Sequence, residues 1–312
     1  MTDTCRTLKE YYGLCIKADL RNAKRVFQRP KGKKLRDLAV RYQSRFLSRI
    51  AQSRVAVQDA FARTVILAYR RYYKQALLQS SNRRIFEKQL KGELATLVGM
   101  PSAKSFDDIE RAIAKELLRR GFHSKPGLVK PLRNILVWKS ERAKIYTVKL
   151  PSKTHTVPVL FLERFLELGW LHFATFGRYY VGGWAEKNRL VCVAKAYKRR
   201  PTDFRVSYLI HETQHFDDYR RFPSLAGGNL EYRAKLCELI FHPHPNKLLK
   251  HFQMMAADDR HNPHAWASHK IVSSIPTGLM RARISKAASE LLRLDTERLK
   301  RIQRRKRGPR QS

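Results

Sequence analysis

Apolar residues recur three and four positions apart through residues 35–97, which is the spacing of an amphipathic helix. The recurring positions form two series: Leu38, Tyr42, Phe46 and Ile50, and then Phe61, Val65, Tyr69 and Tyr73. The polar triplet at 80–82, Ser-Ser-Asn, interrupts the pattern and predicts a break between two helices. Residues 1–35 are polar and basic, so we expect an arm or a loosely packed helix there.

Another helix is predicted to begin directly after Ser105. The Ser105 hydroxyl can accept a hydrogen bond from the first turn, and Asp108 follows three positions later, as in a capping box. Apolar residues then repeat at helical spacing until Gly121, a residue type that commonly ends helices. The first 125 residues are therefore predicted to be a basic, helical N-terminal region.

The pattern then changes to short runs rich in β-branched and aromatic residues, which are typical of strands. Strands are predicted over 134–138, 144–150 and 156–160. Residues 163–168 are expected to be helical. Residues 179–184 and 189–197 flank a polar turn at 185–188 and predict a β-hairpin.

Helical spacing resumes near Thr202, and either Thr202 or Asp203 is expected to cap the first of these helices. Residues 304–312 are basic and are predicted to be a disordered tail. The fold class is therefore α+β, in three parts. A basic helical region (1–125) precedes a domain (126–303) in which a small β-sheet packs on helices, and the tail follows.

Charge adds a second expectation. The chain of 312 residues carries 65 Lys and Arg against 26 Asp and Glu, a formal net charge of +39. A field of this sign attracts polyanions, so nucleic acid, anionic lipid or an acidic protein could each be a partner. No known DNA-reading motif is present, and any contact with nucleic acid is therefore expected to be non-specific.

Cellular location is predicted from apolar runs and cysteines. No stretch approaches the ~20 apolar residues that a transmembrane helix needs, and the N-terminus does not resemble a signal peptide. The four cysteines, Cys5, Cys15, Cys192 and Cys237, are widely spaced and form no CxxC pair. They are expected to be free thiols in a reducing compartment, with Cys192 and Cys237 in the core, and we expect a cytoplasmic protein.

The strongest chemical signal is the segment 211–215, His-Glu-Thr-Gln-His. His211 and His215 are four positions apart, so on a helix both imidazoles leave the same face and can reach one zinc ion at ~2.0–2.1 Å. Glu212 projects beside them and can reach a water molecule without itself binding the metal. It is therefore the candidate general base.

A catalytic zinc site usually needs a third protein ligand and one open position. Residues 223–229 can turn the chain, and Glu231 then begins a second helical pattern, so two antiparallel helices would bring Glu231 back to the histidines. Glu231 is the favoured third ligand. His242 and His244 are alternatives that would make a three-histidine site. Asp218 is predicted to accept a hydrogen bond from one of the histidine ligands.

This arrangement resembles the zincin metallopeptidases, in particular the gluzincin branch, over roughly residues 179–240. The resemblance implies that His211, His215 and Glu231 bind zinc and that Glu212 is the general base. It also implies that the edge strand of the hairpin pairs with an extended peptide substrate. Lys235 departs from the pattern, since an acidic residue is often found four positions after the glutamate ligand.

Two other zincin branches were considered. Asp218 and Arg221 occupy positions where the extended metzincin motif has glycine and histidine, so that branch is excluded. A site completed by His242 or His244 would resemble the SprT-like proteases, which act on proteins crosslinked to DNA. The basic composition favours that alternative, whereas the long spacing and the lack of a zinc-ribbon cysteine set count against it.

Peptide hydrolysis also needs a donor for the developing oxyanion. Tyr219, Tyr232 and His264 are candidates, and His264 is preferred because it lies in a polar cluster at 260–266. The sequence thus predicts a cytoplasmic zinc metallopeptidase that acts on a protein or peptide. The alternative is a basic protein associated with nucleic acid, in which the histidines bind a structural metal or none.

Overall fold

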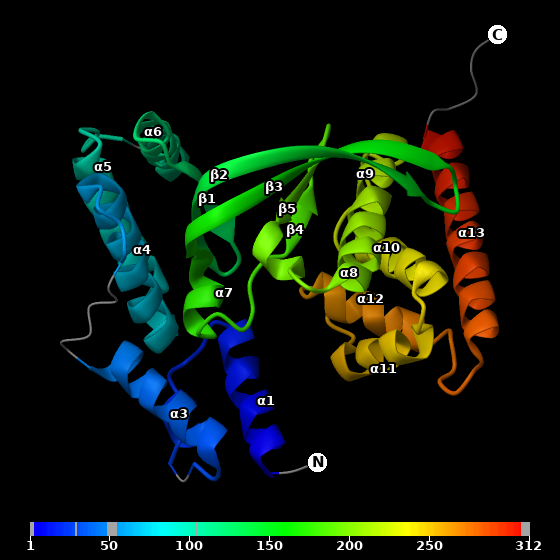
Figure 1. Ribbon diagram of the computed structural model, residues 1–312, viewed down its shortest axis with the longest axis horizontal. Coiled ribbons are helices and arrows are strands. Elements are labelled where there is room, and N and C mark those ends of the chain that lie inside the picture. Colours follow the sequence, from blue (N-terminus) through cyan, green and yellow to red (C-terminus); the bar gives the residue numbers. More distant parts are fainter. Residues whose placement is uncertain (1–2, 29, 49–54, 104, 307–312) are drawn as a thin grey trace. The chain divides into compact units, whose positions relative to one another are not determined.

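A computed structural model describes residues 3–28, 30–48, 55–103 and 105–306 (Figure 1). The chain divides into two compact units. Unit 1 comprises Met1–Ser140 and Glu163–Val181, and unit 2 comprises Glu141–Leu162 and Gly182–Ser312. The chain passes between the units within strand β2 (Leu132–Lys149), within strand β3 (Thr154–Leu168) and after Val181. The sequence predicts boundaries near residues 125 and 303.

Unit 1 is mainly helical. Its elements are α1 (Asp3–Ile16), α2 (Ala23–Val26), α3 (Lys33–Tyr42), the π-helical η1 (Gln43–Leu47), α4 (Ala60–Leu78), η2 (Ser80–Asn82), α5 (Arg83–Leu97), α6 (Phe106–Arg119), β1 (His123–Val129) and α7 (Gly169–Ala174). The break at 80–82 is confirmed. Ser105 caps α6 by accepting from the Asp107 amide at 3.2 Å, and Gly121 follows with φ of 80°. Ile50, which ends the first apolar series, lies outside the described residues.

The expectation of an arm or a loosely packed helix at residues 1–35 is wrong for α1, which is a well-packed helix. Tyr11 and Cys15 of α1 are completely buried in the core of unit 1. The Tyr11 hydroxyl donates to the carbonyl of Ala174 at 2.8 Å. These two residues are four positions apart, so they form a short apolar stripe that the surrounding basic residues obscure in the sequence.

The strands form one sheet in the order β1-β2-β3-β5-β4. Hairpin strands β4 (Gly183–Ala185) and β5 (Leu190–Val193) pair antiparallel, as predicted, although both are shorter than expected. β5 also pairs parallel with β3. The predicted helix at 163–168 is wrong, since these residues complete β3. A six-residue segment is too short for its periodicity to distinguish the two structures.

Unit 2 places helices beside this part of the sheet. They are η3 (Ala194–Tyr197), α8 (Pro201–Asp203), the π-helical η4 (Phe204–Ile210), α9 (His211–Arg221), α10 (Gly228–Phe241), α11 (Pro245–Met255), α12 (Pro263–Val272) and α13 (Arg281–Lys306). Val159 of β3 and Cys192 of β5 share one buried core with Tyr208, Phe216 and Cys237. The α+β fold, with the sheet packed on the histidine-bearing helix, is therefore confirmed.

Three details of unit 2 bear on the predictions. The helix cap expected at Thr202 or Asp203 is wrong: α8 starts at Pro201 with no side-chain cap, and Asp203 pairs with Arg200 at 2.6 Å. α13 continues to Lys306, whereas the rest of the predicted tail, 307–312, lies outside the described residues. No helix in the described part of the chain is long and apolar enough to cross a membrane.

The edge strand β4 depends on a glycine. A Cβ atom on Gly183 would overlap the ring of Tyr208 and the carbonyl oxygen of Val191. We expect Gly183→Ala to lower the free energy of unfolding by ~1–3 kcal/mol, as measured by urea denaturation. Gly92→Ala in α5 is the control, because a Cβ there meets no atom within 4 Å. It should stabilise by ~0.5–1 kcal/mol, and equal losses in both variants would contradict the packing argument.

Candidate metal centre

The two histidines lie at the start of α9, directly after the π-helical turn η4. A π-helical turn within a longer helix is frequently found at functional sites. The four-residue spacing places both imidazoles on one face, as predicted. The Nε2 atoms of His211 and His215 are 3.1 Å apart, and their ring planes are nearly perpendicular, at 89°. Both side chains are buried.

Glu231 joins them from the first turn of α10. Residues 222–227 reverse the chain, so that α10 packs against α9 (Figure 1). One carboxylate oxygen of Glu231 lies 3.4 Å from His211 Nε2, and the other lies 3.4 Å from His215 Nε2. The turn and the approach of Glu231 to the histidines were both predicted from the sequence.

The spacing of these three groups fits a metal ion. Ligand atoms held ~2.0–2.1 Å from one ion at tetrahedral angles lie about 3.3–3.4 Å from one another. The two Nε2 atoms are 3.1 Å apart, and each lies 3.4 Å from a different carboxylate oxygen of Glu231. Glu231 Oε2 is buried and lies 3.4 Å from His211 Nε2 and 2.8 Å from His264 Nδ1. Two imidazoles and one carboxylate are a donor set suited to zinc.

The pKa values of His211 and Glu231 are shifted in opposite directions. Burial opposes a charge on His211, but hydrogen bonds to Glu231 and Glu238 outweigh it and raise the His211 pKa to about 10. Burial likewise opposes ionisation of Glu231, yet its hydrogen bonds to the histidines hold the Glu231 pKa far below its usual value. Without a cation, a proton on the imidazole supplies the positive charge that this carboxylate requires.

Glu238 is the functional residue that the sequence argument missed. Its Oε1 accepts a hydrogen bond from His211 Nδ1 at 2.8 Å, and both groups are buried. Such a carboxylate fixes the tautomer and the orientation of a metal-binding imidazole. Glu238 stands seven positions after Glu231, two helical turns along the same face of α10. That spacing was the signal available in the sequence.

Asp218 was predicted to take this orienting role, and that prediction is wrong. Its Oδ2 accepts instead from Arg233 Nε at 2.8 Å, and both side chains are buried. His215 Nδ1 is buried and has no hydrogen-bond partner among the described residues. The orienting contact therefore serves His211 alone.

The alternative histidine ligands lie elsewhere. His242 and His244 follow the end of α10, where His242 Nδ1 accepts from the His244 amide at 2.9 Å. In the described part of the chain, the group compatible with a metal ion consists of His211, His215 and Glu231. The structure thus brings together the favoured ligands and leaves the three-histidine alternative unsupported.

Three further predicted residues can now be placed. The ring of Tyr219 stacks on His215, with 6.3 Å between the centroids. His264, at the start of α12, has its Nδ1 2.8 Å from Glu231 Oε2, and its side chain is 56% exposed. Tyr232 is buried away from the centre, where Lys270 Nζ lies 3.8 Å from the centroid of its ring. Tyr219 and His264 therefore adjoin the centre and Tyr232 does not.

Glu212 is half-buried next to His211. Its negative charge contributes to the pKa of two nearby tyrosines. It adds to the effect of burial in raising the pKa of Tyr219, and it does the same for Tyr208, which packs under β4. α9 also packs against β4, the last strand of the sheet order.

Comparison with known proteins finds no similar protein. No protein-family model, curated protein or solved structure matches this chain. The interpretation of the centre therefore rests on its geometry.

Proposed function

We propose that unit 2 is a zinc-dependent metallopeptidase of the zincin type. The observation that carries the proposal is the convergence of His211 Nε2, His215 Nε2 and Glu231 at separations of 3.1–3.4 Å, with Glu212 next in the chain to the first ligand. Three protein ligands with room for a fourth are the pattern of a catalytic zinc site, whereas structural zinc sites are usually closed by four.

Zinc bound here would supply Lewis-acid chemistry, polarising a substrate carbonyl and lowering the pKa of water to about 7. Glu212 accepts the proton of the attacking water and passes it to the leaving amine. Glu238 orients His211. The edge strand β4 offers backbone groups to an extended peptide, which is the binding mode expected for this class.

Tyr219 is the better donor to the oxyanion, and His264 takes a positioning role in this proposal. His264 Nδ1 faces Glu231, so Nε2 of a neutral ring carries no proton to donate. The phenol of Tyr219 is protonated near neutral pH, and burial followed by the charge of Glu212 raises its pKa further. This assignment replaces the initial preference for His264.

The direct test is metal content combined with activity. The full chain, loaded with zinc and desalted, should retain one zinc per molecule and should cleave an unstructured protein such as casein. Chelation should remove both the metal and the activity, and zinc should restore them. A wild-type chain that binds no zinc would overturn the proposal.

Removal of the third ligand gives a sharper result. Loss of a residue that only orients a metal ligand typically weakens metal binding by about 10–100-fold. Glu231→Ala removes a proposed ligand itself, so we expect it to weaken zinc binding by at least ~100-fold. Glu238→Gln should fall within that smaller range. Asp258→Ala, at an exposed site in unit 2, is the control. Competition with a zinc-sensitive dye measures all three, and unchanged affinity in Glu231→Ala would exclude Glu231 as a ligand.

Association with nucleic acid or another polyanion stays a prediction that rests on the net charge of +39. Binding of basic residues releases counterions from DNA, and added salt opposes this release. Retention on DNA should therefore fall steeply as the salt concentration rises.

A further inference from the structure

Unit 2 contains a second feature with chemical character, a cavity of about 310 Å³. It lies between α9, α10, α13 and the turn that joins β2 to β3. The members of the metal group do not line it. Gln214 and Arg221 of α9 line the cavity from a different face of the helix that carries His211 and His215.

The lining is basic, although several of its donors are already paired, among them Arg293, which pairs with Glu290 and Glu297. Four basic side chains contribute to it: Arg221, Arg233, Arg293 and Lys300. Glu297 is the one carboxylate among its lining residues, and hydroxyl groups come from Ser152, Ser289 and Thr296. The hydroxyls donate to Asp217 and to the carbonyls of Ser285 and Leu292. Guanidinium groups match the oxygens of a tetrahedral oxyanion, since arginine presents paired N–H groups in a planar fork.

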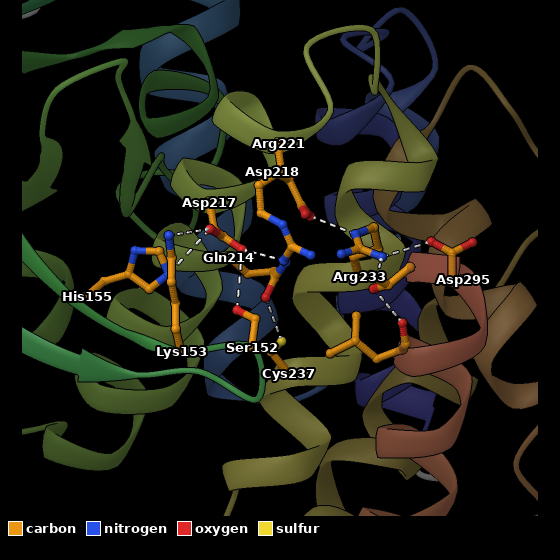
Figure 2. A network of polar contacts seen from close by, with 12 residues as sticks. Ser152, Lys153, His155, Gln214, Asp217, Asp218, Arg221, Arg233, Cys237 and Asp295 are labelled. Atoms are coloured by element: carbon orange, nitrogen blue, oxygen red, sulfur yellow. Dashed lines mark hydrogen bonds and ion pairs between the residues drawn. The ribbon is translucent and has the colours of Figure 1, made fainter. Parts of the chain in front are cut away.

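Two of these arginines, Arg221 and Arg233, are held in place by acidic residues (Figure 2). Asp217 Oδ2 accepts from Arg221 Nη1 at 2.8 Å, and Asp218 Oδ2 accepts from Arg233 Nε at 2.8 Å. Asp295 Oδ2 accepts from Arg233 Nη1 at 3.1 Å. These carboxylates reduce the net positive charge of the wall. They also fix the guanidinium groups, which lowers the entropic cost of binding an anion.

Donor capacity remains after these contacts. Arg233 is almost completely buried and uses Nε and Nη1, but its Nη2 makes no hydrogen bond to another described residue. Arg221 likewise uses only Nη1 toward Asp217. The exposed Lys300 adds a cation at the rim. The cavity thus has fixed donors inside and an exposed cation at its rim.

We propose that this cavity binds a small phosphate-bearing ligand. Its volume lies at the lower end of the ~300–1,000 Å³ typical of small-molecule sites, which suits a phosphate, a diphosphate or a mononucleotide. The ligand would contact α9, α10 and α13 together, so its binding would stabilise the packing of these helices. The site is separate from the metal centre, and the inference does not depend on the proposed peptidase activity.

The test is calorimetric titration of the full chain with inorganic phosphate, pyrophosphate and adenosine monophosphate at constant ionic strength. Saturable binding of one molecule per chain is expected for at least one of them. Lys300→Glu should weaken that binding by about tenfold or more, whereas Lys300→Arg should restore it. Lys250→Glu, at an exposed site on α11, changes the net charge equally and should leave the affinity unchanged.

Two controls separate this site from other sources of binding. Glu231→Ala alters the metal centre and not the cavity, so this variant should bind the anion as the wild type does. Loss of anion binding in Glu231→Ala would indicate that the anion binds at the metal centre. Equal weakening by Lys300→Glu and Lys250→Glu would indicate general attraction to a basic surface and overturn the proposal, as would no saturable binding of any probe. Tight binding of phosphate alone identifies the phosphoryl group as sufficient, whereas a preference for the mononucleotide identifies a larger ligand.

Discussion

Glu212→Gln is expected to bind zinc with the affinity of the wild type and to lose peptide hydrolysis by at least ~100-fold. General acid–base catalysis contributes roughly 10²–10⁴-fold, and glutamine keeps the size of the side chain but cannot accept the proton. Glu212 is not a member of the metal group, so the ligand set is unchanged. Zinc content and the initial rate of casein cleavage measure the two effects on the same preparation.

The matched control is Glu290→Gln, at an exposed position of α13 in the same unit. It should retain both zinc and activity. Full activity in Glu212→Gln would contradict the assignment of the general base, even if the metal centre itself were verified. Loss of zinc from Glu212→Gln would instead indicate that Glu212 supports the ligands.

Arg233→Met is expected to cause the largest loss of stability, ~3–5 kcal/mol in the free energy of unfolding. Arg233 is 1% exposed, and it pairs with Asp218 and Asp295, which are 0% and 7% exposed. Methionine fills much of the space of the arginine stem, but it leaves the buried Asp218 without a cation, and Asp295 keeps only Arg298 at 2.8 Å. Urea denaturation, followed by circular dichroism, measures the loss.

Arg293→Met is the control for this variant. Arg293 makes comparable ion pairs with Glu290 and Glu297, but on the exposed surface of α13. Surface pairs contribute little because water screens them, so stability should be nearly unchanged. A loss in Arg293→Met as large as that in Arg233→Met would contradict the role of burial.

The convergence of His211, His215 and Glu231 could be predicted from the sequence because it depends on short-range geometry. A four-residue spacing fixes two side chains on one helix face, and a short turn returns the next helix beside the first. His211, His215 and Glu231 follow from these two rules. The hairpin preceding α8 was predictable for the same reason, since a polar turn separates two apolar runs.

The features that were missed depend on contacts between distant positions. Whether residues 163–168 form a helix or a strand is decided by pairing within a sheet and not by their own pattern. Asp218 could have served either a histidine or an arginine. The choice follows from the packing of α9 on α10, which brings Arg233 within 2.8 Å. Glu238 does not follow from the gluzincin pattern, because that pattern places an acidic residue at position 235, one turn after Glu231, where this chain has Lys235.

The division of β2 and β3 between the two units has a consequence for synthesis of the chain on the ribosome. Unit 1 requires residues up to Val181, but Glu141–Leu162 of unit 2 is translated before that point. The N-terminal unit therefore cannot be completed before part of the C-terminal unit has emerged. Domains that are continuous in sequence fold one after another as they are made. Here the strand segment Glu141–Leu162 is synthesised before residues 182–312, with which it forms unit 2. We therefore expect aggregation and chaperone binding at this stage of synthesis.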